Sequence, residues 1–248
     1  MEFNDHFSGH AGLYRDARPL PPADWFAWLA GQARNLELAW DAGCGNGQAS
    51  VGLATHFTRV VASDPSGAQI ARAQTNARVD YRVEPAEHSS LADTSASLVS
   101  VSQALHWFDL DAFYAEVRRV ARPGALLAVS AYGNCSVDRA VDAVERELYA
   151  STLAPDWPPE RALVDAGYRD LPFPFERVDA PSFAMQAAWN LAQFLAYLGS
   201  WSATQRHLAR TGVDPVRVAT PELTAAWGDP QQVRAVRWPF LSLVGRSG

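Results

Sequence analysis

Two acidic residues and three glycines in one stretch of this sequence are spaced to bind a ligand. The segment "LAWDAGCGNGQAS" runs from apolar residues into Asp41, and glycines follow at Gly43, Gly45 and Gly47. A glycine-rich turn after a strand lets a ligand approach the backbone closely, because no side chain intervenes. Asp64 follows about 20 residues later, the spacing at which an acid reaches the hydroxyls of a bound ribose. These residues predict a site for a cofactor that contains a nucleoside.

The residues around the glycines discriminate between cofactors. A dinucleotide fingerprint ends in a small residue that allows close helix packing, and Gln48 occupies that position here. Asp41 would repel a pyrophosphate, whereas it would attract the positive amino and sulfonium groups of S-adenosylmethionine. The pattern therefore favours S-adenosylmethionine, and an NAD-dependent oxidoreductase stays as the alternative.

The basic residues and cysteines exclude several other chemistries. All 21 basic residues are arginines, so the chain has no lysine for a Schiff base or for a phosphate-binding P-loop. Cys44 and Cys135 belong to no CxxC pair, which argues against a disulfide framework or a zinc site. We find no Ser-His-Asp pattern typical of hydrolases, and we predict no bound metal.

Composition and charge argue against some classes of binding partner. The chain has 248 residues and a formal net charge of −6, whereas a nucleic-acid-binding domain usually shows a basic face. No apolar run approaches the roughly 20 residues of a membrane helix, and the N-terminus lacks the apolar core of a signal peptide. We expect a cytoplasmic protein that binds neither nucleic acid nor membrane. Its oligomeric state is left open by the sequence.

Strand-like and helix-like patterns alternate around these residues. The seven strand candidates are 36–42, 59–64, 79–84, 97–103, 125–132, 175–185 and 232–246. The main helix candidates are 47–57, 66–77, 109–121 and 190–209. Alternation of this kind is typical of βαβ units. It predicts an α/β, doubly wound, Rossmann-like and mostly parallel seven-stranded sheet with helices on both faces.

The alternation of strand-like and helix-like segments changes after the fifth strand candidate. Residues 134–174 are first polar and helical and then rich in proline. We interpret them as a helical insertion or cap on a single domain that spans residues 1–248. The sheet core would then comprise about 30–133 and 175–248.

Four segments in order resemble the class I S-adenosylmethionine-dependent methyltransferases. "DAGCGNGQ" (41–48) resembles their motif I, and "ASDPS" (62–66) resembles their ribose-binding acidic segment. "EPAEHSSLADTSASLVSVSQALHWFD" (84–109) resembles their adenine-binding loop and fourth strand. "VARPGALLAVSAYG" (120–133) is similar to the end of the following helix and the fifth strand. The resemblance spans about residues 10–133.

A narrower resemblance joins three further segments to one branch of that family. "YRDARPLPP", "SQALHWF" and "LGSWSA" are similar to segments of small-molecule methyltransferases that include the trans-aconitate type. Pro21 stands where the first of these patterns ends in a tyrosine.

The resemblance implies a set of cofactor contacts. Asp41, Gly43 and Gly45 would line the methionine part, Tyr14 would close over it, and Asp64 would bind the ribose hydroxyls. The residues implied at the adenine are Pro65, Ser66, Ala86 and Glu87, and those implied at the sulfonium are Gln103 and Ala104.

Other residues are candidates for the acceptor side. His106 is the nearest candidate base for a hydroxyl or amine acceptor, because its ordinary pKa is near neutrality. Trp107 could attract the sulfonium through its ring face, and Arg15 and Arg18 could grip an acidic acceptor bidentately. Trp201 would belong to a helix over the site. Each also has a purely structural interpretation. His106 and Trp107 could cover the end of the sheet, Arg15 and Arg18 could be surface arginines, and Trp201 could be a core aromatic residue.

We therefore predict an S-adenosylmethionine-dependent methyltransferase that acts on a small molecule, with a small carboxylic acid favoured. Methyl transfer from a sulfonium is an in-line displacement that needs alignment and exclusion of water. A carboxylate acceptor would need no general base, since it is already an anion. The alternatives are the oxidoreductase above and a methyltransferase-like module that binds its ligand without turnover.

Overall fold

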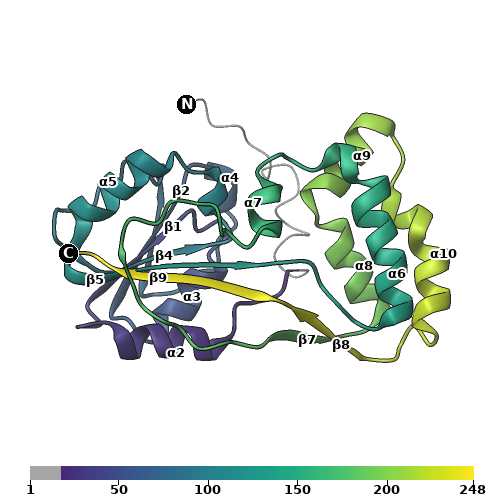
Figure 1. The fold of residues 1–248 in the computed structure, drawn as a ribbon, viewed down its shortest axis with the longest axis horizontal. Helices are drawn as coiled ribbons and strands as arrows, with labels where there is room; N and C mark the ends of the chain where they lie inside the picture. Colours follow the sequence, from purple (N-terminus) through teal and green to yellow (C-terminus); the bar gives the residue numbers. More distant parts are fainter. Residues whose placement is uncertain (1–17) are drawn as a thin grey trace.

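The computed structural model describes residues 18–248, so Tyr14 and Arg15 lie outside the described residues. Its centre is a seven-stranded sheet in the order β3-β2-β1-β4-β5-β9-β6 (Figure 1). The strands are β1 (Leu38–Ala42), β2 (Arg59–Asp64), β3 (Val79–Val83), β4 (Ala96–Ser102), β5 (Ala121–Tyr132), β6 (Glu176–Arg177) and β9 (Phe240–Arg246). β1 to β5 are mutually parallel, and β9 runs antiparallel to both of its neighbours. The predicted fold class is confirmed.

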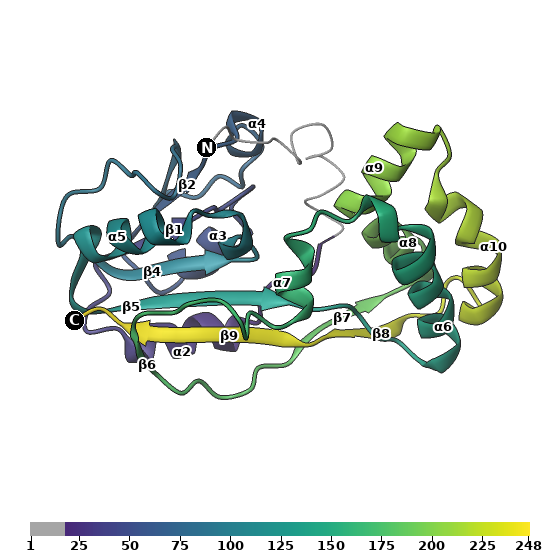
Figure 2. The same cartoon turned by 45° about the horizontal axis from the view of Figure 1, so that its top comes forward.

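Alternate strand residues build two cores on opposite faces of the sheet. In β1, Ala39 faces the core formed with α2 (Ala23–Gln32) and α3 (Gln48–Ala54). Its neighbour Trp40 faces the other core, which packs against α5 (Leu110–Val120). Figure 2 shows α2 and α5 on opposite sides of the sheet. Coverage of both faces explains why strands such as β4 are buried along nearly their whole length.

A helical layer lies beyond the carboxyl ends of the parallel strands (Figure 1). Its helices are α6 (Arg139–Glu147), α8 (Leu191–Gly199), α9 (Ser202–Thr211) and α10 (Pro215–Trp227). A two-stranded ribbon, β7 (Met185–Trp189) with β8 (Arg234–Trp238), joins the layer to the sheet. The layer thus draws on two segments of the chain, whereas we expected the cap to come from 134–174. The single-domain assignment stays a prediction.

The short helices connect the sheet to this layer and to the loops. They are α4 (Gly67–Ile70), η2 (Leu105–Trp107), η3 (Leu148–Thr152), η4 (Ala154–Asp156) and α7 (Arg161–Asp165). α4 is much shorter than the expected helix 66–77, whose later residues include Thr and Asn, which favour turns. Within residues 18–248, no helix combines the length and apolar character needed to cross a bilayer.

Three expected elements are each split in the structure. The expected strand 175–185 forms only β6 and the first residue of β7, Met185, and residues 178–184 belong to no strand. The expected helix 190–209 breaks at Trp201, whose backbone is extended and begins α9. The expected last strand divides into β8 and β9 at Pro239, which has no N–H to continue a ladder. Because of the division at Pro239, residues 234–246 contribute β8 to the two-stranded ribbon and β9 to the main sheet.

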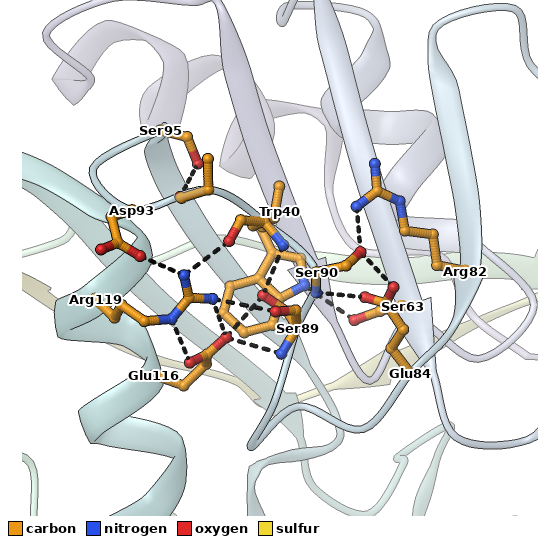
Figure 3. Close-up of polar contacts among 12 residues, drawn as sticks. Trp40, Ser63, Arg82, Glu84, Ser89, Ser90, Asp93, Ser95, Glu116 and Arg119 are labelled. Carbon is orange, nitrogen blue, oxygen red and sulfur yellow. Dashed lines mark hydrogen bonds and ion pairs between the residues drawn. The ribbon is translucent and has the colours of Figure 1, made fainter.

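A buried hydrogen bond connects β1 and β2 directly beneath the glycine loop. The indole N–H of Trp40 donates to the Ser63 hydroxyl at 2.9 Å, as Figure 3 shows. The Ser63 carbonyl accepts from the backbone N–H groups of Gly43 and Cys44, at 2.8 and 3.0 Å. The loop is therefore anchored on a residue that the tryptophan holds in place.

We predict that Trp40 and Ser63 are energetically coupled through their hydrogen bond. Trp40→Phe should lower the free energy of unfolding by about 1–3 kcal/mol, because it leaves the buried Ser63 hydroxyl without its donor. Adding Ser63→Ala to that variant should cost less than Ser63→Ala costs alone, since no polar group is then left unpaired. Urea unfolding of the four proteins measures this cycle, and strictly additive effects would contradict it.

Candidate functional site

The glycine loop between β1 and α3 needs each of its glycines. All three have positive φ, +69° at Gly43, +55° at Gly45 and +84° at Gly47. A Cβ at Gly43 would lie 2.8 Å from the Cβ of Ala104, and one at Gly47 would lie 2.1 Å from the Tyr81 hydroxyl. A Cβ at Gly45 would meet nothing within 4 Å. The first and third glycines thus allow close packing, and the second leaves open space beside the backbone.

That open space belongs to a cavity of about 780 Å³ at the carboxyl ends of the strands. The volume lies within the usual range of small-molecule sites. The expected site residues on its wall are Arg18, Gly43, Gly45, Asp64, Pro65, Ser66, Ala86, Glu87, Gln103, Ala104 and Trp107. Asp41, His106 and Trp201 are not on the wall. Most of the expected residues are therefore brought to one place, although they come from distant parts of the chain.

Asp41 lies at the end of β1, immediately before the loop, and is fully buried. Its Oδ2 accepts a hydrogen bond of 2.5 Å from the Ser50 hydroxyl, and its Oδ1 has no partner among the described residues. Burial raises the pKa of Asp41 to about 7, and the charge of Asp64 acts in the same direction against the Ser50 bond. A cation bound at the loop would stabilise the ionised carboxylate. This orphaned oxygen therefore fits a positively charged ligand.

Asp64 ends β2 on the wall of the same cavity. Its Oδ2 accepts from the backbone N–H of Gly45, and its Oδ1 accepts from that of Ser66, both at 2.9 Å. The Ser66 hydroxyl in turn accepts from Gln69 and caps α4. Asp64 thereby places a carboxylate between the glycine loop and the start of α4, where it can accept hydrogen bonds from the two hydroxyls of a ribose.

Two further wall residues carry polar atoms that the sequence analysis did not single out. The Asn46 amide nitrogen and the Gln69 amide oxygen are buried and have no hydrogen-bond partner in the described part of the chain. A bound nucleoside offers both donors and acceptors, so these groups fit the expected ligand. Asn46 could have been found from its place inside the glycine loop, whereas nothing local marks Gln69.

Gln103 connects the ends of β4 and β5. Its backbone is left-handed, with φ +57°, and its backbone N–H donates to the Ser130 carbonyl at 2.8 Å. Its amide oxygen accepts from the Tyr132 N–H at 2.8 Å, and its amide nitrogen donates to the Tyr132 carbonyl at 3.4 Å. Gln103 is on the wall as expected, but its side-chain amide bonds the neighbouring backbone.

Arg18 brings a positive charge to the cavity wall near the helical layer. Its Nη1 donates to the Tyr132 hydroxyl at 3.1 Å, and its Nη2 donates to the Ser200 carbonyl at 2.8 Å. The guanidinium also lies 5.9 Å from the centre of the Tyr197 ring. Apolar side chains, including Phe240, complete this end of the wall. The far end of the cavity therefore combines a cation with a phenol and an apolar surface.

The structure places His106 beside Tyr168 rather than on the cavity wall. Its Nδ1 lies 2.7 Å from the Tyr168 hydroxyl. Burial, together with the nearby Arg161 guanidinium, lowers the pKa of His106 to about 3. The imidazole is therefore neutral across the physiological pH range, and its Nδ1 already forms a hydrogen bond with Tyr168. This geometry gives the expected role of acceptor-side base no support.

Trp201 is a core residue of the helical layer. It is 3% exposed, and its ring lies 5.6–5.7 Å from the rings of Tyr149, Trp157 and Tyr197. The structural interpretation of this tryptophan therefore fits the geometry better than direct contact with an acceptor. Trp107, by contrast, does line the cavity.

Comparison with known proteins gives concordant results. The family described as "Methyltransferase domain" matches residues 40–129. A methyltransferase of Dictyostelium discoideum, whose description gives no substrate, is 32% identical over 205 residues, covering 81% of this chain and 78% of that protein. A solved structure from Anaeromyxobacter dehalogenans, described as a type II methyltransferase, is 50% identical with a TM-score of 0.86, covering 92% of this chain and 97% of that one.

A shorter match concerns an enzyme with a named acceptor. The malonyl-[acyl-carrier protein] O-methyltransferase of Dechloromonas aromatica is 38% identical over 96 residues. That match covers 38% of this chain and 36% of the enzyme. It therefore compares little more than a third of each chain.

We predict that Gly45→Ala weakens cofactor binding without unfolding the protein. The new Cβ would project into the open space of the loop, and the left-handed φ would cost an alanine about 1–2 kcal/mol. The dissociation constant for S-adenosylmethionine should rise about tenfold or more in calorimetry. Gly31→Ala is the matched control, because a Cβ there also meets nothing within 4 Å but lies in α2. Equal affinities in the two variants would contradict the assignment of the loop.

We also predict that cofactor affinity depends on the ionisation of Asp41. Because the raised pKa keeps this carboxyl partly protonated below about pH 7, binding of a cation must release a proton there. The affinity should increase from pH 6 to pH 8 and then level off, and Asp41→Asn should bind weakly without that increase. Calorimetry at several pH values with one ligand measures both. A slope that persists unchanged in Asp41→Asn would show that another group is responsible.

Proposed function

This chain belongs to the class I S-adenosylmethionine-dependent methyltransferases, and we propose that its methyl acceptor is a small molecule that carries a carboxylate. The family makes it an enzyme whose cofactor is S-adenosylmethionine. Its relatives are methyltransferases, so the NAD-dependent oxidoreductase is no longer a competing interpretation. We retain a cytoplasmic location and the absence of a nucleic-acid partner as part of the proposal.

The residues of the glycine loop and β2 would hold the cofactor. Asp64 would accept hydrogen bonds from the ribose hydroxyls, and the open backbone at Gly45 would admit the amino-acid part. The buried charge of Asp41 would favour the cationic groups. When bound, S-adenosylmethionine supplies an electrophilic methyl group.

One observation carries the choice of acceptor: Arg18 lies on the cavity wall beyond the expected cofactor site. A guanidinium binds a carboxylate through paired, charge-assisted hydrogen bonds. The Tyr132 hydroxyl, 3.1 Å from Arg18 Nη1, could donate to the same anion. The apolar neighbours Met185 and Phe240 would receive the carbon skeleton of a small acid.

A second cation lies one residue beyond the wall residue Glu160. The Arg161 Nε donates to the Tyr149 hydroxyl at 3.0 Å and to Asp165 at 2.9 Å. Neither terminal nitrogen of Arg161 has a hydrogen-bond partner among the described residues, although the side chain is only 15% exposed. Because Asp165 balances the charge of Arg161 and this side chain is not on the cavity wall, the choice of an acidic acceptor rests on Arg18.

The proposed mechanism needs positioning rather than proton transfer. An acceptor carboxylate is already ionised at neutral pH, so no base has to remove a proton from it. Arg18 would orient the acid, and the Trp107 ring would exclude water and favour positive charge. The low pKa and buried position of His106 agree with a reaction that does not require it as a base. The O-methyltransferase among the relatives is compatible with transfer to oxygen.

We predict that the product is a methyl ester. Incubation with S-adenosylmethionine and a panel of small mono-, di- and tricarboxylic acids should release S-adenosylhomocysteine with at least one of them. The product should gain one methyl group by mass spectrometry and lose it in mild base. A product stable to base, with the methyl on nitrogen or carbon, would contradict the proposed acceptor class.

Arg18→Gln tests the residue that carries the proposal. It should raise the KM for the acid about tenfold or more, because a charge-assisted bond is lost, while cofactor affinity changes little. Arg122→Gln is a suitable control, since Arg122 pairs with Glu37 at 2.6 Å and is not on the cavity wall. An unchanged KM in Arg18→Gln would remove the support for acid recognition by this residue.

A further inference from the structure

The loop between β3 and β4 is held by two carboxylates and two guanidinium groups (Figure 3). None of these four side chains lines the cavity. Glu116 of α5 is 6% exposed, and its Oε1 accepts from the backbone N–H of Ser89 at 2.8 Å and from its hydroxyl at 2.9 Å. Burial alone would raise the pKa of Glu116, but the bonds from Arg119 and Ser89 outweigh burial and lower the pKa to about 2. Glu116 is therefore a fixed anion at any ordinary pH.

Arg119 completes this arrangement one turn further along α5. Its Nε and Nη2 form a fork on the Glu116 carboxylate at 2.9 and 2.6 Å. The same side chain donates to the carbonyls of Leu91 and Ser89, at 2.8 and 3.1 Å, and to the Asp93 carboxylate at 2.6 Å. One arginine thus binds three residues of the loop as well as its own helix.

A second pair closes the base of the loop from the side of β3. The Glu84 carboxylate accepts from the backbone N–H of Ser90 at 3.0 Å and from its hydroxyl. Arg82 Nη1 donates to that hydroxyl at 2.8 Å. Residues 89–93, which form no helix or strand, are consequently fixed from both sides.

The same loop supplies part of the cavity wall. Pro85, Ala86 and Glu87 line the cavity, and one residue, His88, separates them from the fixed residues. Glu87 Oε1 also accepts from the backbone N–H of Asp109, the N-cap of α5, at 3.0 Å. α5 therefore contacts the loop at both of its ends, beside the cavity through Asp109 and away from it through Glu116 and Arg119.

We propose that Glu116 and Arg119 are positioning residues that preorganise this loop for the adenosine end of the cofactor. The proposal rests on the cofactor placement given under the proposed function. Ordering a backbone residue costs about 1–2 kcal/mol, so a loop that is already ordered spares the ligand that cost on binding. Neither side chain lines the cavity, and their effect reaches the ligand through Ala86 and Glu87.

The test compares binding and turnover in Arg119→Gln and Glu116→Gln with those in the unchanged enzyme. Dissociation constants are measured for S-adenosylmethionine and for 5′-methylthioadenosine, which keeps the adenosine but lacks the amino-acid end. Both should rise by the same factor, about ten- to a hundredfold, which corresponds to ordering one or two residues. The kcat at saturation and the KM for the acceptor should stay unchanged. Arg119→Lys, which keeps the charge without the fork, should give an intermediate loss.

Arg122→Gln serves as the control for loss of an arginine ion pair, because Arg122 binds Glu37 away from this loop. The proposal is overturned if the Arg119 variants bind both ligands as the control does, or if kcat falls at unchanged cofactor affinity. If a glutamine variant fails to fold, hydrogen exchange decides with Arg119→Lys: the amides of residues 85–91 should exchange faster without ligand, and unchanged exchange overturns the proposal. Failure of the unchanged enzyme to bind either ligand would instead refute the cofactor site itself.

Discussion

The structure depends on a buried carboxyl group whose hydrogen bonds the protein itself only half satisfies. Asp41 has one carboxylate oxygen bonded to Ser50 and the other without a partner in the described chain, immediately before a turn in which Gly43, Gly45 and Gly47 alternate with Cys44 and Asn46. Leaving a buried charge unpaired is costly unless a ligand supplies the opposite charge. A cationic nucleoside at this turn resolves the imbalance, whereas a diphosphate would increase it. The requirement for Gly43 and Gly47 follows from packing, and that for Gly45 follows from access.

The sheet topology brings the remaining groups to the same edge. Parallel strands place their carboxyl ends together, and the strand order reverses between β1 and β4, where ligands of such sheets bind. At the far end of the cavity, Tyr132 and Arg18 lie on the wall, and Arg18 bonds to the helical layer. Arg18 reaches from the start of the described chain to Ser200 at the end of α8, so the helical layer holds this wall residue in place. In the proposed function, acceptor recognition at Arg18 is therefore separated in space from cofactor binding at the glycine loop.

The sequence allowed the sheet and the glycine loop to be predicted because both follow from local patterns. β2 was predicted at its observed bounds, and the motif residues Asp64 and Gly45 lie on the cavity wall. Contacts between distant residues could not be predicted in this way. Arg119 meets Ser89 only because α5 packs beside the loop. His106 has the residue type of a base, but its burial against Tyr168, which changes its pKa, is a property of the fold.

A crystal structure of the protein with S-adenosylhomocysteine would test the central claim most directly. The account predicts ribose hydroxyls within hydrogen-bond distance of Asp64, the amino-acid part against Gly43 and Gly45, and the adenine beside Ala86. The ligand ammonium should lie near the carboxylate of Asp41. Density for the ligand in any other part of the cavity, or against the helical layer alone, would contradict it.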